Sequence, residues 1–208
     1  MLEIRGLQVA LIDEPLALRT RGGEAVRWRA RLVDDDGRSW RAQAARAEEL
    51  DGAWAPAKSG AGPVAALASL RPVRLDVRAE TAGGEAASRT LERRLLADGV
   101  QRRRWRAPAP PGSLFLPAQE TRGVVVLPPE TTLAGALLAS RGVVALAVGD
   151  ERRDDALELL ARVPAAAGHA PVLLDDIGLP PGIPALASGD GAAWDALLER
   201  VGATPRSG

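Results

Sequence analysis

Cysteine is absent from this 208-residue chain, and histidine and lysine each occur once, as His169 and Lys58. Without cysteine the chain can form no disulfide, no thiolate metal site and no cysteine nucleophile. The 27 basic and 27 acidic residues cancel, so no net field favours a nucleic acid or an anionic membrane as partner. The richness in alanine, arginine, glycine and proline is typical of a GC-rich bacterial genome.

Long apolar runs are also missing. The longest apolar stretch, residues 124–148, is interrupted by Pro128, Glu130 and Arg141. Because a membrane-spanning helix needs about 20 consecutive apolar residues, we expect no membrane span. Glu3 and Arg5 lie near the start without an apolar region after them, so we expect no signal peptide and a cytoplasmic location.

The first half of the chain has the period-two pattern of β-strands. Apolar and polar residues alternate in three runs, residues 26–32, 40–44 and 73–79. The pair Asp36-Gly37 between the first two runs predicts a hairpin. After a turn at Gly83-Gly84, further strands are expected over residues 88–96 and 100–106. Short strands that each have one apolar face predict a β-sandwich over residues 1–107.

Two features of this half allow a functional interpretation beside a structural one. Trp28 and Trp40 could stack a ligand, but their alternation with polar residues favours the inward face of a hairpin. The arginine-rich run of residues 102–106 could bind phosphates or a nucleic acid. Successive side chains in a strand point to opposite faces, and the net charge gives no supporting field, so we expect no nucleic-acid partner.

The pattern changes after a proline-rich connector at residues 108–112. Continuous apolar strands are expected at residues 124–127 and 143–148, and shorter strands at 172–174 and 183–187. Helices are expected at residues 132–140, with Thr131 or Thr132 as the cap, at 150–162, with Asp150 as the cap, and at 192–201. We expect the last seven residues to be frayed. Strand–helix alternation of this kind predicts a small parallel sheet covered on both faces, over residues 113–208.

Both halves together resemble the acyl-CoA thioester hydrolase and bile acid-CoA:amino acid N-acyltransferase family. The resemblance covers residues 15–148 and is carried by the segments 26–40, 51–54, 66–72, 91–100 and 112–117. It implies an N-terminal immunoglobulin-like β-sandwich and a C-terminal α/β-hydrolase domain, here truncated. It also implies an acyl-CoA as a possible ligand.

The chain departs from this family where catalysis would take place. It contains no Gly-x-Ser-x-Gly motif, and Pro128-Pro-Glu-Thr-Thr132 stands where the family carries a glycine-rich loop. Residues 183–194 are similar to the late segment that carries the triad acid, which places the acid near Asp190. No histidine follows that segment.

The remaining catalytic candidates are Ser188, Asp190 and His169. His169 precedes the acid-like segment, which reverses the hydrolase order of serine, acid and histidine, so we interpret it as an ordinary loop residue. Ser140, at a predicted helix end, is interpreted as part of a cap rather than as a nucleophile, because activation needs a nearby base.

Acidic and glycine-rich turns in the second half are further candidates for ligand sites. Asp175 and Asp176 follow a predicted strand and could hold a divalent cation together with Asp150, but the spacing favours a solvated turn. The segment Gly189-Asp190-Gly191 lacks the rest of a phosphate-binding loop. We therefore expect no metal and no cofactor.

Three functions remain open. The first is a family homologue that has lost its triad and acts in binding or assembly. The second is an active thioesterase or acyltransferase in which Ser188, Asp190 or His169 acts across a subunit interface. The third is a structural component of a larger complex. A shortened sheet leaves apolar edges to be covered, so a homo-oligomer or another protein partner is expected.

Overall fold

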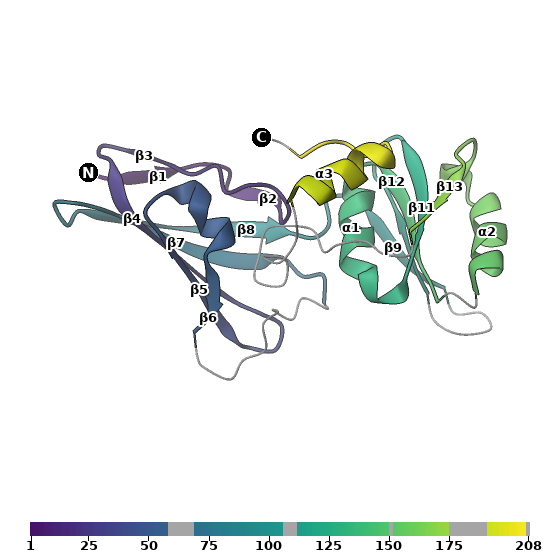
Figure 1. Cartoon of the computed structure of the whole chain (residues 1–208), viewed down its shortest axis with the longest axis horizontal. Helices are drawn as coiled ribbons and strands as arrows, with labels where there is room; N and C mark the ends of the chain where they lie inside the picture. Colours follow the sequence, from purple (N-terminus) through teal and green to yellow (C-terminus); the bar gives the residue numbers. More distant parts are fainter. Residues whose placement is uncertain (58–68, 106–111, 150–151, 175–190, 207–208) are drawn as a thin grey trace. The chain divides into compact units, whose positions relative to one another are not determined.

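The computed structural model describes residues 1–57, 69–105, 112–149, 152–174 and 191–206 (Figure 1). These residues form two compact units, one made of residues 1–94 and the other of residues 95–174 and 191–206. Strands dominate the first unit, and the second combines strands with α-helices, so the expectation of a mixed α/β chain with a β-rich first half is confirmed.

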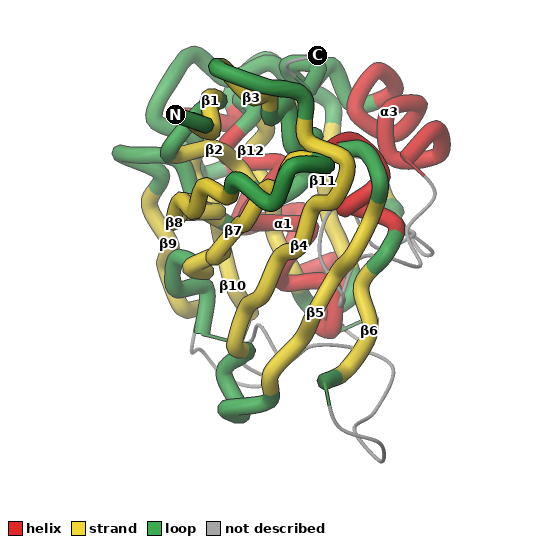
Figure 2. Tube along the Cα trace, turned by 90° about the vertical axis from the view of Figure 1, so that its left-hand side faces the viewer, coloured by secondary structure: helices red, strands yellow, loops and turns green. Residues whose placement is uncertain are grey.

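The first unit is built on a six-stranded sheet in the order β2-β8-β7-β4-β5-β6. All neighbouring strands are antiparallel except β2 and β8. Figure 2 shows β8, β7, β4, β5 and β6 side by side in this order. The bounds are β2 (Val9–Leu11), β4 (Ala25–Val33), β5 (Ser39–Ala44), β6 (Trp54–Pro56), β7 (Val73–Thr81) and β8 (Ala86–Arg94).

Alternation along the strands gives this sheet one buried face. Trp28, Ala30 and Leu32 of β4 are buried, and the arginines between them are exposed. The structural interpretation of the tryptophans is confirmed, because Trp28 and Trp40 are only 4% and 1% exposed. The predicted hairpin is confirmed as well, since β4 and β5 pair antiparallel around Gly37, whose φ of 77° suits glycine.

The buried face is covered by short elements. Strand β1 (Glu3–Arg5) pairs with β3 (Arg19–Arg21) in a two-stranded ribbon, and the 3-10 helix η1 (Ala47–Gly52) packs on β5. Buried apolar residues of these elements and of the loop before β3 complete the core: Ile4, Ile12, Leu16, Leu18, Ala47 and Leu50. The first unit is therefore one large sheet under a thin second layer, and its immunoglobulin-like character stays a prediction.

The second unit contains a five-stranded sheet in the order β13-β11-β12-β10-β9. Strands β11, β12 and β13 are parallel, while β10 is antiparallel to both β12 and β9. The bounds are β9 (Gln101–Trp105), β10 (Gly112–Leu116), β11 (Gly123–Leu127), β12 (Val143–Ala147) and β13 (Pro171–Leu173).

Helices cover both faces of this sheet, as expected. Ala156 and Leu160 of α2 (Arg153–Ala161) pack on Leu114, Val126 and the other side chains of one face. On the opposite face, Gly135 of α1 (Thr132–Ser140) lies against Phe115 and Leu127. Helix α3 (Gly191–Arg200) lies on the α1 side (Figure 1). Two 3-10 turns, η2 (Pro129–Thr131) and η4 (Pro164–Ala166), precede α1 and β13.

Strand β9 is the main difference from the predicted domain division. Its alternation grouped it with the sandwich of residues 1–107, but β9 pairs with β10 from Gln101 to Trp105. The division of the chain between the two units therefore falls between Arg94 and Leu95. Periodicity identified the strand, but its backbone hydrogen bonding to β10 decides which sheet it joins.

The predicted frayed tail is wrong for residues 202–206. The backbone N–H of Thr204 donates to the Arg141 carbonyl at 2.9 Å, and the Arg141 guanidinium donates to the Pro205 carbonyl at 2.8 Å. Arg206 makes two hydrogen bonds of 2.6 Å to the carboxylate of Asp195 on α3. These partners, with buried Ala203, hold the tail in place.

Candidate functional site

The carboxyl edge of the parallel strands is where α/β sheets usually bind ligands. Pro128, Val148 and Leu174 follow the three parallel strands, and all three are buried. The backbone N–H of Val148 donates to the Leu127 carbonyl, and that of Leu174 donates to the Val126 carbonyl. The part of this edge that the structure describes is therefore built from apolar side chains and backbone hydrogen bonds.

The threonine hydroxyl groups near this edge form hydrogen bonds to backbone carbonyls. Thr131 or Thr132 was predicted to cap α1, and Thr131 occupies the cap position, but its side chain makes no capping hydrogen bond. The hydroxyls of Thr131 and Thr132 instead donate to the carbonyls of Pro128 and Pro129, at 2.6 and 3.0 Å. This use of short polar side chains stabilises the 3-10 turn that leads into the helix.

Ser140 is a structural residue, as its position at the end of α1 indicated. Its hydroxyl donates to the Ala136 carbonyl at 2.9 Å and accepts the backbone N–H of Ala97 at 2.8 Å. The second bond connects α1 to the segment before β9. Both the proton and a lone pair of the Ser140 hydroxyl are thus engaged.

His169 lies in the loop between η4 and β13 and is half-buried. Its backbone N–H donates to the Ala166 carbonyl, which completes a turn. Within the described ranges, no hydrogen bond joins its imidazole to Ser140 or to any other side chain. The other sequence candidates, Ser188 and Asp190, lie outside the described residues, as do Asp150, Asp175 and Asp176.

Among residues 1–57, 69–105, 112–149, 152–174 and 191–206, no group of three or more metal-ligating side chains comes together.

The arginine-rich run of β9, which could have bound phosphates, makes contacts within the protein. Arg102 stacks over the Phe115 ring, 5.6 Å from its centroid, and donates to the Ser113 hydroxyl at 3.0 Å.

A buried charged cluster lies beneath the first sheet. Arg93 of β8 is 4% exposed, and its guanidinium donates to the Glu14 carbonyl. Burial lowers the pKa of Arg93, whereas the negative charges of Asp51, Glu14 and Asp13 oppose that shift. Asp51 also accepts the backbone N–H of Leu16 at 2.9 Å. The cluster connects β8, η1 and the loop before β3, which is a structural role.

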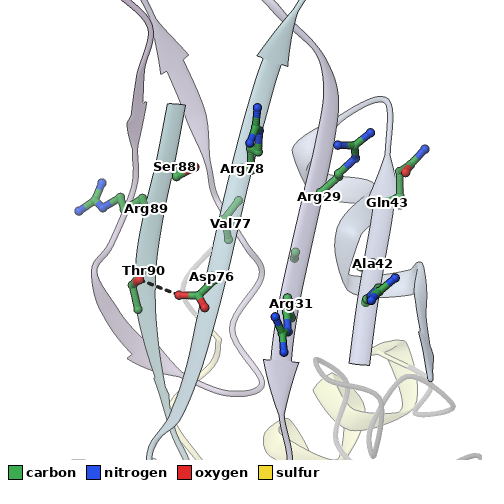
Figure 3. A pocket seen from close by; sticks show the side chains of 12 residues that line it. Arg29, Arg31, Ala42, Gln43, Asp76, Val77, Arg78, Ser88, Arg89 and Thr90 are labelled. Carbon is green, nitrogen blue, oxygen red and sulfur yellow. Dashed lines mark hydrogen bonds between the residues drawn. The ribbon is translucent and has the colours of Figure 1, made fainter. Parts of the chain in front are cut away.

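A hollow of about 660 Å³ opens on the other, exposed face of the six-stranded sheet. This volume lies within the range of about 300–1,000 Å³ that is usual for small-molecule sites. Figure 3 shows Arg29 and Arg31 of β4 between Gln43 of β5 and the β7 side chains Asp76 and Arg78. The lining residues are Arg29, Ala30, Arg31, Arg41, Ala42, Gln43, Asp76, Val77, Arg78, Ser88, Arg89 and Thr90.

The register of the strands brings several arginines together in this hollow and makes it positively charged. Arg31 is directly opposite Arg41 on β5, and Arg29 is directly opposite Arg78 on β7. Asp76 is the only acidic residue among these described lining residues, and its carboxylate accepts the Thr90 hydroxyl at 2.7 Å (Figure 3). We refer to Arg29, Arg31, Arg41 and Arg78 as the arginine face.

Sequence reasoning did not identify the arginine face. The alternation of Arg27, Arg29 and Arg31 was visible, but it indicated only an exposed strand face. The pairing of Arg31 with Arg41 depends on the register of the β4–β5 hairpin, and the pairing of Arg29 with Arg78 depends on the register of two strands far apart in the sequence. A search for hairpin partners of the arginines could have found the Arg31–Arg41 pair, because β4 and β5 are joined by a short turn.

No protein-family model matches this chain, and no curated protein matches it either. In the described ranges, no helix combines the length and the apolar character needed to cross a bilayer. What the protein does must therefore be inferred from its own residues and their geometry.

Proposed function

We propose that this protein is a divergent relative of the acyl-CoA thioester hydrolase and bile acid-CoA:amino acid N-acyltransferase family, and that it binds a ligand or partner without thioester hydrolysis. The observation that carries this proposal is the strand order of the second unit. Two antiparallel strands, β9 and β10, lead into the parallel strands β12, β11 and β13. An α/β-hydrolase sheet begins with the same order and with its second strand antiparallel to its neighbours.

The surroundings of the described hydroxyl groups support the non-catalytic part of the proposal. A serine nucleophile needs a base within hydrogen-bond reach. Ser140 instead donates to a helix carbonyl, and Thr131 donates to Pro128. Val148 and Leu174, which follow two of the parallel strands at the edge where a hydrolase would hold its acyl group, are buried apolar residues and offer no catalytic side chain.

The edge strand β13 supports a role in assembly. Within the described residues it lies at one end of the sheet order, and it carries Leu173, which is 40% exposed. An unpaired edge offers backbone N–H and carbonyl groups to another chain. A second copy of the protein or a different protein partner would extend the sheet there, and an acyl-CoA remains the proposed small ligand.

The test measures hydrolysis and binding on the same protein. Release of CoA from acetyl-, octanoyl- and palmitoyl-CoA is followed with a thiol reagent, to which the cysteine-free protein adds no background. Binding of octanoyl-CoA is measured in parallel by calorimetry, and the oligomeric state by light scattering. We expect CoA release at the spontaneous rate, saturable binding, and a mass above that of one chain.

Two results would change the assignment. Turnover that disappears in His169→Ala but survives in Ser140→Ala would establish an active enzyme with an unconventional site. Neither turnover nor binding, with a folded protein that still self-associates, would leave only a structural component of a larger complex. The Ser140→Ala variant is the matched control, because its hydroxyl makes structural bonds on the same unit.

A further inference from the structure

Two rows of the six-stranded sheet place like charges directly opposite each other. On the exposed face, Arg31 is the cross-strand partner of Arg41, and Arg29 is the partner of Arg78. Directly opposite side chains in an antiparallel pair have their Cβ atoms about 5 Å apart, and like charges at that position are destabilising. The chain as a whole is neutral, so this concentration of charge is local.

The flanking rows of the same face are arranged differently. Arg27 is the neighbour of Glu80, and their charged groups lie 3.9 Å apart in an ion pair. Arg74 is directly opposite Glu92. Opposite charges therefore face each other on both sides of the arginine face, whereas the two central rows bring arginines together.

No described carboxylate forms an ion pair with the arginine face. Arg29, Arg41 and Arg78 make no ion pair or hydrogen bond to the described residues. Arg31 has only a long contact of 3.5 Å to the Ser39 hydroxyl. Asp76 is directly opposite Arg31, but its carboxylate accepts the hydrogen bond of Thr90 and forms no ion pair with Arg31.

Guanidinium groups in such an arrangement match phosphate oxygens. Each guanidinium presents a planar fork of donors, and a phosphate has three oxygens that can be shared between two such forks. Successive residues on one face of a strand are about 6.8 Å apart and neighbouring strands about 4.8 Å, so the two arginine pairs can hold two separate phosphate groups. Gln43 and Ser88 add neutral donors at the rim.

We propose that the arginine face binds a small molecule that carries at least two phosphate groups, of about the size of a nucleotide. The hollow of about 660 Å³ has room for such a ligand and for its non-phosphate part. Because all of these residues lie in the first unit, the proposal does not rest on the hydrolase resemblance of the second.

The same face is less suited to a nucleic acid. Single strands are held by aromatic side chains on which bases stack, along an extended basic groove. None of the described lining residues is aromatic, and Trp28 and Trp40 are buried under the opposite face. The charge is also confined to the hollow, since paired acidic residues border it.

The test uses the full chain at low salt in the presence of a metal chelator. Calorimetry measures binding of sodium tripolyphosphate, ATP, inorganic phosphate and a single-stranded oligonucleotide. We expect tripolyphosphate and ATP to bind and to raise the melting temperature, with inorganic phosphate much weaker. Arg31→Gln and Arg78→Gln should each weaken binding by about tenfold, since each removes one charge-assisted interaction.

Further variants distinguish binding at the arginine face from a general attraction of anions to the protein surface. Asp76→Asn removes the acidic group but keeps an oxygen for Thr90, and it should tighten binding by about threefold. Arg19→Gln makes the same charge change as the test variants at an exposed position of β3 and should leave affinity unchanged. Without ligand, Arg31→Gln and Arg78→Gln should melt no lower than the native protein, because they relieve repulsion.

Three outcomes would overturn the proposal. One is the absence of saturable binding of tripolyphosphate and ATP to the folded protein. Another is a loss of affinity in Arg19→Gln equal to that in Arg31→Gln and Arg78→Gln, which would show that the ligands are attracted by the surface charge in general. The third is tight binding of the oligonucleotide with none of the small phosphates, which would assign the arginine face to nucleic acid.

Discussion

The indole Nε1 of Trp40 donates a hydrogen bond of 3.0 Å to Oδ2 of Asp34, at the base of the β4–β5 hairpin. The other carboxylate oxygen of Asp34 accepts the backbone N–H groups of Asp36 and Arg38, at 3.1 and 2.8 Å. Asp34 is 6% exposed. One buried carboxylate thus shapes the turn and satisfies the polar atom of the largest core side chain.

Asp34→Ala should therefore destabilise the first unit. The substitution leaves the buried Nε1 of Trp40 without this acceptor and removes two turn hydrogen bonds, so we expect a loss of about 3 kcal/mol in the free energy of unfolding. Urea denaturation followed by tryptophan fluorescence measures it. The control is Asp36→Ala, at an exposed position of the same turn, and an equal loss in both variants would contradict the role of Asp34.

Arg93→Met tests the buried charged cluster. The change removes the buried positive charge that attracts Asp13, Glu14 and Asp51, and it removes the hydrogen bond to the Glu14 carbonyl. Removing one charge from a buried cluster of opposite charges costs about 3–5 kcal/mol. Arg74→Met, on an exposed site of the adjacent strand, should change the free energy of unfolding by less than about 0.5 kcal/mol. Equal stability of Arg93→Met and the native protein would show that the cluster contributes nothing.

Gly123→Ala tests the packing of the tail on the second sheet. A Cβ at this position would lie 2.2 Å from the Val201 carbonyl oxygen, so the end of α3 would have to move. We expect a loss of about 3 kcal/mol or more in thermal or urea unfolding, as for severe overpacking. Gly52→Ala is the matched control, because no atom lies within 4 Å of its added Cβ. A native-like melting temperature for Gly123→Ala would argue against this packing.

The Asp195–Arg206 pair predicts a pH dependence at the acidic end. Hydrogen bonds from Arg206 lower the pKa of Asp195 below its ordinary value of 3.8. Because the folded-state pKa is the lower one, the pair stabilises the protein above the unfolded pKa and loses this contribution as the pH falls through the folded value. The Asp195 side chain is 51% exposed, so solvent screening limits the effect to about 0.5–1 kcal/mol.

Urea midpoints at neutral and at strongly acidic pH check this prediction. Asp195→Asn should lower the free energy of unfolding at neutral pH, because it removes the contribution of the pair. On acidification the native protein loses this contribution as well, so the difference in stability between the two proteins should shrink. Glu199→Gln, at an exposed position of the same helix, should behave like the native protein. An identical acid dependence in Asp195→Asn and the native protein would exclude a contribution from the pair.

Some of the candidate site residues could be interpreted from the sequence pattern, and others could not. Ser140 lies at the helix end as predicted, but its hydroxyl bonds to the Ala136 carbonyl inside the helix and to the distant Ala97 instead of capping it. Thr131 lies at the predicted cap position and Thr132 begins the helix, but their hydroxyls bond to preceding carbonyls. The arginine face was missed, although each of its residues was visible in an alternating strand. Its chemistry exists only after three strands have been aligned.

The sequence by itself determined the three helices, the longer strands and the faces that these strands bury. Alternation in β4 and β7 and the continuous apolar runs of β11 and β12 specify burial locally, because side chains alternate across a strand. Only the tertiary structure decided that β9 belongs to the second sheet, that the tail is held by Arg141, and that Arg31 faces Arg41. Each of these depends on the register between strands or on contacts between separate segments, which the periodicity of a single segment does not encode.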